Sequence, residues 1–439
     1  MRLILAVLLG RLIFFLSRTF KIGGGSAAPG LYALKIDPDL VEKLAKKIPQ
    51  NVVITGTNGK TTTARILAHF AHESGLKVIR NSTGSNLERG IASALINHFS
   101  QGVNLVHPWG GLASHLGIWE LDEADFNNVA PKLKPDIVVF LNVFRDQLDR
   151  YGEVDSVVKR WHQTLEILPK NTIILVNGDD ANTAKLNSYF KGRVSQFGVK
   201  DYKIVGESIR HKKESENLDC EAINVKLDGL KGSSFSVVLH DKSYPVTLPI
   251  PGIYHIYDFL AAFYAGSALG FSTEKVISSL KGFQPAFGRV EKLPFGYIFL
   301  IKNPAGATQV FETIGPQIKP EDRLLIALND NLADGTDVSW IWDAEFEKLQ
   351  KSAGVNTNPH RVWFMVSGTR AYDLAIRLKY VGFKSESISV EPNLQKALKR
   401  SREDLKGQLY ILPTYTALLE LQKILAKIGI KKHYWRENL

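Results

Sequence analysis

Short apolar runs recur along this chain, and most are followed by a polar, glycine-containing turn and then by a stretch with helical spacing. This repeated order of strand, loop and helix is typical of doubly wound α/β domains, whose mostly parallel sheets place their ligand-binding loops after the strands. The runs form two series, at residues 52–54, 76–80, 116–121, 135–142 and 172–177 and at residues 297–301, 324–328, 361–366 and 407–413. We therefore predict an α/β fold with a central domain at residues 36–293 and a smaller α/β C-terminal domain at residues 294–439.

Residues 197–248 have a different pattern. Apolar and polar residues alternate at 222–227 and again at 234–239, after a charged stretch at 201–217. Alternation with a period of two predicts half-buried β-strands, and two such runs close in sequence predict a pair. We expect a β-rich insertion within the central domain.

Residues 1–35 begin with an apolar segment that is interrupted by Arg11 and followed by Arg18 and Lys21, and residues 23–25 form a glycine-rich link. The segment is too short and too charged for a bilayer span, which needs about 20 apolar residues. It predicts a helix, for which two roles stay open. Either the helix packs on the central domain, or it lies on a membrane face with its basic residues beside it.

Composition limits the classes of partner. The 439 residues are 44% hydrophobic and 23% charged, as in folded globular proteins, and 55 Lys and Arg against 44 Asp and Glu give a net charge of +11. That excess favours anionic partners, although no arginine-rich tract, zinc finger or aromatic RNA-binding pattern indicates a nucleic acid. The single cysteine, Cys220, is expected in a charged loop, and alone it excludes an intramolecular disulfide and a cysteine-cluster metal site. We expect a cytoplasmic protein.

The strongest chemical signal is a small-residue turn between the apolar run at residues 52–54 and the helical stretch that follows it. Glycines let backbone N–H groups close on a polyphosphate, and a helix N-terminus adds partial positive charge. A lysine at this point reaches the outer phosphates, and a threonine hydroxyl can hold Mg²⁺. The expected nucleotide-binding residues are Gly56, Thr57, Asn58, Gly59, Lys60, Thr61 and Thr62, with Lys60 also catalytic.

A carboxylate at the end of the run at residues 116–121 is the second candidate. Mg²⁺ prefers hard oxygen ligands and is usually held by one or two carboxylates together with phosphates. Glu120 is the expected ligand, together with Thr61. Asp122 and Glu123 are expected in a solvated turn or a helix cap.

The Gly-Thr-Asn-Gly-Lys-Thr-Thr-Thr string at residues 56–63 resembles the ATP loop of the Mur ligase family, whose members form amide bonds through an acyl phosphate. The resemblance assigns Glu120 to the family's metal glutamate. At residue 147 the chain has Gln where amino-acid-adding Mur ligases usually have a His near the metal. The resemblance also implies nucleotide contacts by Asn177, Asp180, His255, Asp258 and Arg289.

Within that family, residues 145–152, 303–306 and 334–343 are most similar to the MurT branch. Many MurT-like chains insert a four-cysteine zinc ribbon at the place of residues 197–248. Because Cys220 alone cannot build such a site, no zinc is expected.

The resemblance to MurT implies a role for an aspartate of the C-terminal domain. In that branch such an aspartate is thought to complete a Cys-His pair of a partner glutaminase, where a carboxylate orients the imidazole beside a thiol. Asp343, at the end of an expected Ser-Trp-Ile-Trp strand, is the first candidate, followed by Asp337 and Asp334. The alternative is that Asp343 caps a helix that begins at Ala344.

Taken over the whole chain, the resemblance implies the ATP-dependent synthetase subunit of a lipid II isoglutaminyl synthase. Such a subunit amidates the D-glutamate carboxylate of the stem peptide, with ammonia from a GatD-like glutamine amidotransferase in a heterodimer. ATP and Mg²⁺ are the expected cofactors, and the expected location is cytoplasmic, including the inner face of the plasma membrane.

Two other functions stay open. One is an amino-acid ligase of the Mur or folylpolyglutamate synthetase type, which would need a substrate-binding front domain where this sequence has only residues 1–35. The other is an ATP-binding scaffold without catalysis, which the retention of Lys60, Thr61 and Glu120 disfavours.

Overall fold

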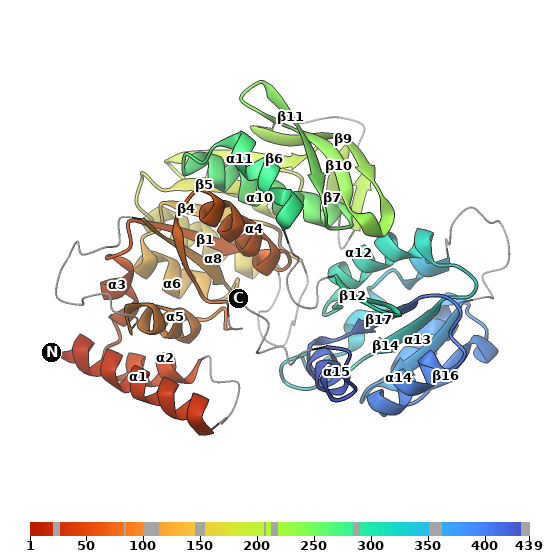
Figure 1. Ribbon diagram of the computed structural model, residues 1–439. Helices are drawn as coiled ribbons and strands as arrows, with labels where there is room; N and C mark the ends of the chain where they lie inside the picture. The colour runs from red at the N-terminus through yellow and green to blue at the C-terminus, as the bar shows by residue number, and fades with distance from the viewer. Residues whose placement is uncertain are drawn as a thin grey trace.

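The computed structural model describes residues 1–20, 27–82, 85–100, 114–144, 154–205, 208–211, 218–283, 290–350 and 362–431. These residues form two α/β units, each built around its own sheet, and the N-terminal helix lies at the outer edge of the larger unit (Figure 1). The predicted fold class, a doubly wound and mostly parallel central sheet followed by a smaller α/β domain, is confirmed.

The larger sheet has nine strands among the described residues, in the spatial order β11-β10-β9-β6-β5-β4-β1-β3-β2. The strands from β2 to β9 in this order pair in parallel, whereas β9, β10 and β11 pair antiparallel. The strands are β1 (Gln50–Thr55), β2 (Lys77–Arg80), β3 (His115–Leu121), β4 (Ile137–Phe140), β5 (Ile173–Asn177), β6 (Arg193–Val199), β9 (Cys220–Leu227), β10 (Ser233–Leu239) and β11 (Lys242–Leu248).

Helices cover both faces of this sheet. Each face of the sheet has its own apolar core. Along β1, Val52 and Ile54 pack in one core and Val53 packs in the other. The first core takes α4 (Lys60–Glu73), α10 (Ile253–Ala268) and α11 (Thr273–Ser279). The second takes α1 (Arg2–Phe20), α2 (Ala28–Ile36), α3 (Leu40–Ala45), α5 (Glu88–Ser100), α6 (Phe126–Leu133) and α8 (Val154–Ile167).

The β-rich stretch extends the main sheet, because β9 continues it from β6 and pairs with β10 through a bulge. A separate two-stranded ribbon, β7 (Tyr202–Val205) and β8 (Ser208–His211), precedes it. The expectation that Cys220 lies in a charged loop is wrong. Cys220 is the first residue of β9 and fully buried, and this burial raises the pKa of its thiol well above the ordinary value.

The smaller sheet has the order β12-β13-β17-β14-β15-β16. Its strands pair in parallel, except that β12 is antiparallel to β13. One face packs on α12 (Pro304–Ile314) and α13 (Ala371–Val381), and the other on α14 (Leu394–Arg402) and α15 (Tyr415–Lys427). The strands are β12 (Glu291–Leu293), β13 (Gly296–Ile298), β14 (Arg323–Ala327), β15 (Trp363–Ser367), β16 (Ile388–Val390) and β17 (Leu409–Pro413).

The segment around Asp343 differs from its prediction. The expected Ser-Trp-Ile-Trp strand is a 3₁₀ helix, η5 (Ser339–Trp342), and no α-helix begins at Ala344, where a second 3₁₀ helix, η6 (Phe346–Gln350), follows. The buried residues Val338, Ile341 and Ala344 are spaced by three, which is the period of a 3₁₀ helix and not of a strand.

In the described part of the chain, no helix is both long enough and apolar enough to cross a bilayer.

Candidate active site

The phosphate loop joins β1 to α4, and its backbone is held by Asn142 at the end of β4. The Asn58 N–H donates to Asn142 Oδ1 (2.9 Å), and Asn142 Nδ2 donates to the Asn58 carbonyl (3.1 Å). Gly59 has a φ of 91°, and a Cβ there would collide with Asp258 Oδ1. Only glycine therefore fits this position.

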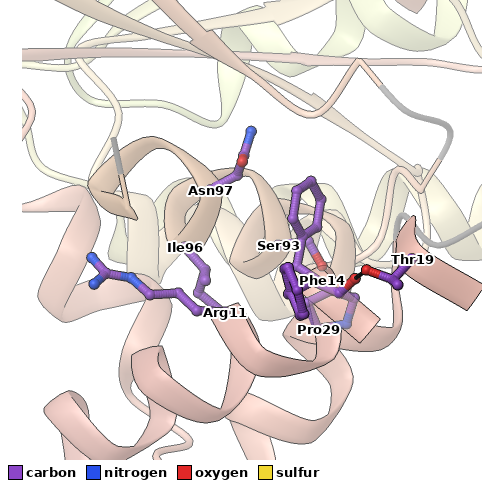
Figure 2. A pocket seen from close by; sticks show the side chains of 8 residues that line it. Arg11, Phe14, Thr19, Pro29, Ser93, Ile96 and Asn97 are labelled. Carbon is purple, nitrogen blue, oxygen red and sulfur yellow. Dashed lines mark hydrogen bonds between the residues drawn. The ribbon is translucent and has the colours of Figure 1, made fainter. Parts of the chain in front are cut away.

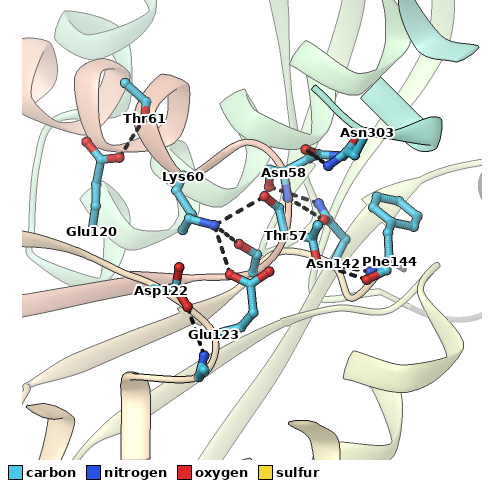
Figure 3. Close-up of polar contacts among 12 residues, drawn as sticks. Thr57, Asn58, Lys60, Thr61, Glu120, Asp122, Glu123, Asn142, Phe144 and Asn303 are labelled. Carbon is cyan, nitrogen blue, oxygen red and sulfur yellow. Dashed lines mark hydrogen bonds and ion pairs between the residues drawn. The ribbon is translucent and has the colours of Figure 1, made fainter. Parts of the chain in front are cut away.

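Lys60 lies folded into this loop. Its Nζ donates to the carbonyls of Gly56 and Thr57 (the latter 3.1 Å) and forms an ion pair with Glu123 Oε2 (3.1 Å), as Figure 3 shows. The side chains of Lys60 and Glu123 are only 9% and 5% exposed. The prediction that Glu123 lies in a solvated turn or a helix cap is therefore wrong. A buried ammonium needs a counter-charge, and Glu123 provides one.

Thr61 and Glu120 form a second pair beside it. The Thr61 hydroxyl donates to Glu120 Oε2 (2.7 Å), and Asn81 hydrogen-bonds both the backbone N–H and the carbonyl of Glu120. Strand β3 lies next to β1, with Glu120 opposite Ile54, so the two oxygen groups meet at the carboxyl ends of both strands. A hydroxyl and a carboxylate are the donors that Mg²⁺ takes together with phosphates.

Asp122 lies in a turn as predicted, since its Oδ1 accepts a hydrogen bond from the Ala124 N–H (3.1 Å). Among the described residues, no three side chains of His, Cys, Asp or Glu come together as a ready-made metal site.

The N-terminal turn of α10 faces the same loop. His255 Nδ1 lies 2.9 Å from Asp258 Oδ2, and the Thr63 hydroxyl donates to Asp258 Oδ1 (3.5 Å). His255 and Asp258 are both buried, and His255 Nε2 has no hydrogen-bond partner among the described residues. If Nδ1 carries the proton toward Asp258, Nε2 is left as an acceptor. An acceptor of that kind suits an amino group of a nucleotide base.

Asn177 and Asp180 lie at the end of β5, where their side chains bind the protein itself. Asn177 Nδ2 donates to the Leu141 carbonyl (2.9 Å). Asp180 accepts from the Thr183 N–H at the start of the short helix α9 (Ala181–Ala184) and from the Val143 N–H. Burial raises the pKa of Asp180. These contacts brace the end of β4, and the predicted nucleotide contacts of both residues stay predictions.

Thr62 is buried at the start of α4. Arg289 and Gln147, named from the sequence, lie outside the described residues.

The C-terminal unit also reaches the phosphate loop, through a residue that was not predicted as a site residue. The side-chain amides of Asn58 and Asn303 donate to each other (3.2 and 3.0 Å), and Lys302 Nζ lies 3.5 Å from the Thr57 carbonyl. Asn303 Oδ1 also caps α12 by accepting from the Gly306 N–H (2.8 Å). The Asn-Pro-Ala-Gly string was the available signal, because Asn before Pro is a helix N-cap pattern.

Comparison with known proteins agrees with this geometry. The Mur ligase middle domain family matches residues 54–266, and the MurT ligase C-terminal family matches residues 300–418. The MurT subunit of lipid II isoglutaminyl synthase (glutamine-hydrolyzing) from Streptococcus pneumoniae is 30% identical over 445 residues, which cover 94% of each chain. The chain belongs to the MurT family. It is therefore an ATP-dependent ligase of the Mur type.

Other relatives agree with the MurT assignment. The MurT subunit from Staphylococcus aureus is also 30% identical, over 90% of this chain and 91% of the relative. Among solved structures, MurF ligase from Thermotoga maritima in complex with ADP has a TM-score of 0.64 at 17% identity, over 90% of this chain and 85% of that one. At that identity the likeness shows the fold alone.

The three aspartates of the MurT-type segment lie in different surroundings. Asp334 is buried and binds both the N–H (2.8 Å) and the hydroxyl of Thr416 at the start of α15, and burial raises its pKa. Asp337 Oδ1 accepts from the Ser339 N–H (2.8 Å) at the start of η5. Asp343 lies at the surface directly after Trp342. Asp337 and Asp343 are both exposed and accessible to a second protein, whereas Asp334 is not.

Proposed function

We propose that this chain is the synthetase subunit of a lipid II isoglutaminyl synthase and acts in peptidoglycan synthesis. It would amidate the D-glutamate carboxylate of the lipid II stem peptide to D-isoglutamine. The observation that carries the proposal is the phosphate loop with its two polar pairs, the buried Lys60–Glu123 pair and the part-buried Thr61–Glu120 pair, in a chain related to MurT subunits over nearly its whole length.

The proposed reaction has two steps. ATP supplies the γ-phosphoryl group to a carboxylate oxygen, which gives an acyl phosphate and ADP. The lone pair of ammonia then attacks the acyl carbon, phosphate leaves, and the nitrogen loses a proton to give the amide. Lys60 would offset negative charge on the transferring group, and Thr61 with Glu120 would hold Mg²⁺. His255 Nε2 would accept from the base of the nucleotide.

A GatD-like glutamine amidotransferase would supply the ammonia, and the surface around Asp343 supports such a partner. Tyr372, Ile376 and Tyr380 repeat every four residues along α13 and, with Trp342, are between 49% and 77% exposed. The rings of Trp342 and Tyr380 touch, with centroids 5.4 Å apart. Exposed aromatic and aliphatic side chains grouped in this way are typical of protein interfaces. We call these four residues the α13 stripe.

The test measures amide formation on lipid II by the chain alone and with a GatD-like partner. We expect ammonium to support amidation by the chain alone, and glutamine to be effective only with the partner. In the complex, Asp343→Asn should lose glutamine-dependent amidation by roughly 10²-fold or more and keep ammonium-dependent amidation, because only the partner's imidazole would lose its carboxylate.

Lys60→Ala is the matched control, and it should lose amidation with both nitrogen sources by roughly 10²- to 10³-fold. Failure of both nitrogen sources, with ligation of an amino acid instead, would replace the proposal by the amino-acid ligase. ATP binding without any turnover in the complex would leave only the scaffold.

A further inference from the structure

The N-terminal helix α1 has one apolar face that packs on the larger domain and a second that does not. Ala6 and Val7 are fully buried in the core shared with α2 and α5. On the opposite side, six large apolar residues are between 41% and 65% exposed: Ile4, Leu5, Leu8, Leu12, Phe15 and Leu16. At 100° per residue these six fall within an arc of about 120°. We call them the outer face of α1.

The charged residues at the N-terminal end of the chain are all basic. Residues 1–36 contain five basic residues and no Asp or Glu, and the first acidic residue of the chain is Asp37. These residues therefore contribute +5 of the net charge of +11, since 5 − 0 = 5 over a segment less than a tenth of the chain. On a helical wheel, Arg2 lies beyond one edge of the outer face, and Arg11 and Arg18 lie beyond the other.

A cavity of about 520 Å³ opens beside the C-terminal half of α1 (Figure 2). Phe15 belongs both to its wall and to the outer face, and Phe14, Pro29 and Ile96 add further apolar wall. Arg11 also lines the cavity and is anchored by a hydrogen bond to the Phe99 carbonyl (2.7 Å). The cavity therefore extends the apolar surface inward next to a fixed cation.

We propose that α1 docks this protein on the surface of an anionic lipid bilayer, with its outer face in the acyl region and its basic residues at the headgroups. A helix with an aliphatic face flanked by arginines binds a bilayer both by apolar burial and by attraction to anionic lipids. The cavity beside Phe15 offers room for an acyl chain. The inference rests on α1 and its surroundings and does not depend on the proposed reaction.

A second copy of the chain fits this surface less well. A two-fold contact through α1 would place one cation-rich segment against an identical one, with no acidic residue within residues 1–36 to neutralise either. A bilayer with anionic headgroups provides the missing counter-charge. The charge pattern therefore favours an anionic lipid surface over a second copy of the chain.

The test is sedimentation of the full-length chain with vesicles that contain no lipid II, without ATP or glutamine. One set of vesicles mixes phosphatidylglycerol with phosphatidylcholine, and the other contains phosphatidylcholine only. We expect the chain to bind the anionic vesicles, and high salt to weaken this binding. The double variant L8E/L12E should reduce the partition coefficient at least about tenfold, because two charges would enter the acyl region.

The matched control is Ile167→Glu, which places the same charge on an exposed apolar residue at the end of α8. I167E should bind vesicles like the natural chain. Because Leu8 and Leu12 are exposed, thermal unfolding of L8E/L12E should match that of the natural chain. The milder variant R2Q/R18Q should weaken binding to anionic vesicles only.

Three results would overturn the proposal: no binding of the natural chain to anionic vesicles, equal binding by L8E/L12E, or equal binding to both kinds of vesicle. A dimer in the absence of vesicles that L8E/L12E dissociates would assign the outer face to a second copy instead. Since no nucleotide or nitrogen source is present, none of these results bears on the amidation chemistry.

Discussion

Two polar pairs, one buried and one part-buried, organise the phosphate loop at the scale of single residues. Lys60 is neutralised by Glu123, and Thr61 is fixed by Glu120. The first pair includes the lysine that would contact phosphate, and the second includes the oxygens that would contact a metal. These contacts hold the polar groups of the loop in fixed positions, and groups that are already ordered cost less to order on binding.

The role of Glu120 predicts a metal-specific defect. Glu120→Gln should raise the Mg²⁺ concentration needed for half-maximal ATP hydrolysis by roughly 10- to 100-fold, because an amide oxygen replaces a charged ligand. Asp122→Asn is the control, since Asp122 accepts a backbone hydrogen bond in the neighbouring turn and should titrate like the natural chain. Equal Mg²⁺ dependence of both variants would contradict the assignment.

Glu123 predicts an effect on stability that a nucleotide reverses. Glu123→Gln leaves the buried Lys60 ammonium without its carboxylate, so the free energy of unfolding without nucleotide should fall by about 3 kcal/mol. Because phosphates would supply the missing negative charge, ATP should raise the melting temperature of E123Q more than that of the natural chain. Glu386→Gln, at an exposed acidic residue, should change neither quantity. An equal ATP-induced shift in E123Q would show that Glu123 does not balance Lys60.

His98 predicts a loss of stability in mild acid. Burial, with a smaller contribution from His115, lowers the pKa of His98 from 6.5 to about 4, and the two rings lie 5.0 Å apart. Between those values the unfolded chain binds a proton that the folded chain does not, so stability falls as the pH drops from 6.5 toward 4. Since His98 is only half-buried, we expect a loss of about 1 kcal/mol.

The check is urea denaturation of the natural chain and of His98→Asn, at neutral pH and at about pH 5. The natural chain should lose about 1 kcal/mol more than H98N between the two conditions. Parallel losses would show that His98 keeps its ordinary pKa in the folded protein.

At the scale of elements, the start of α12 has two functions that can be separated. Asn303 caps this helix through Oδ1 and reaches the phosphate loop through Nδ2. The same side chain makes both contacts. A change that disturbs the N-terminal end of α12 should therefore also disturb the contact between the smaller domain and the phosphate loop.

Two substitutions of Asn303 should divide these functions. Asn303→Ala removes the cap and should lower the free energy of unfolding by about 1 kcal/mol. Asn303→Asp keeps an oxygen for the cap and should unfold like the natural chain, yet its kcat/KM for ATP should fall about tenfold, since it loses the donor to Asn58 and adds negative charge beside the loop. If kcat/KM for ATP falls tenfold in N303A but not in N303D, the only role of Asn303 is to cap α12.

At the scale of the whole molecule, the smaller domain presents the α13 stripe and Asp343 on its surface, while its α12 end contacts the phosphate loop. If the stripe receives the partner, Tyr380→Glu should weaken partner binding at least about tenfold and leave ATP hydrolysis by the chain alone unchanged. Ile428→Glu, beyond the end of α15, places the same charge on another exposed apolar residue of this domain. If calorimetry gives the same partner affinity for both variants, the interface does not include the α13 stripe.

The sequence by itself determined the features that are local in the chain. The apolar runs with their following turns predicted β1 to β5 of the larger sheet and β13, β14, β15 and β17 of the smaller one, but not β6, β11, β12 or β16. The glycines with Lys60 and Thr61 predicted the phosphate loop. These signals are readable because side-chain period and turn chemistry depend on neighbouring residues. One local prediction was wrong: residues 339–342 were expected to form a strand but form a 3₁₀ helix. The buried residues Val338, Ile341 and Ala344 are spaced by three, as in such a helix.

Only the tertiary structure decided which distant residues meet. Glu123 lies 63 residues from Lys60, and Asn303 lies 245 residues from Asn58, so no local pattern could pair them. Cys220 was assigned to a loop from its charged neighbours, whereas pairing of β9 with β6 buries it. Periodicity reports which face of an element is apolar, but contacts between elements follow from strand order and domain packing, which are properties of the folded chain.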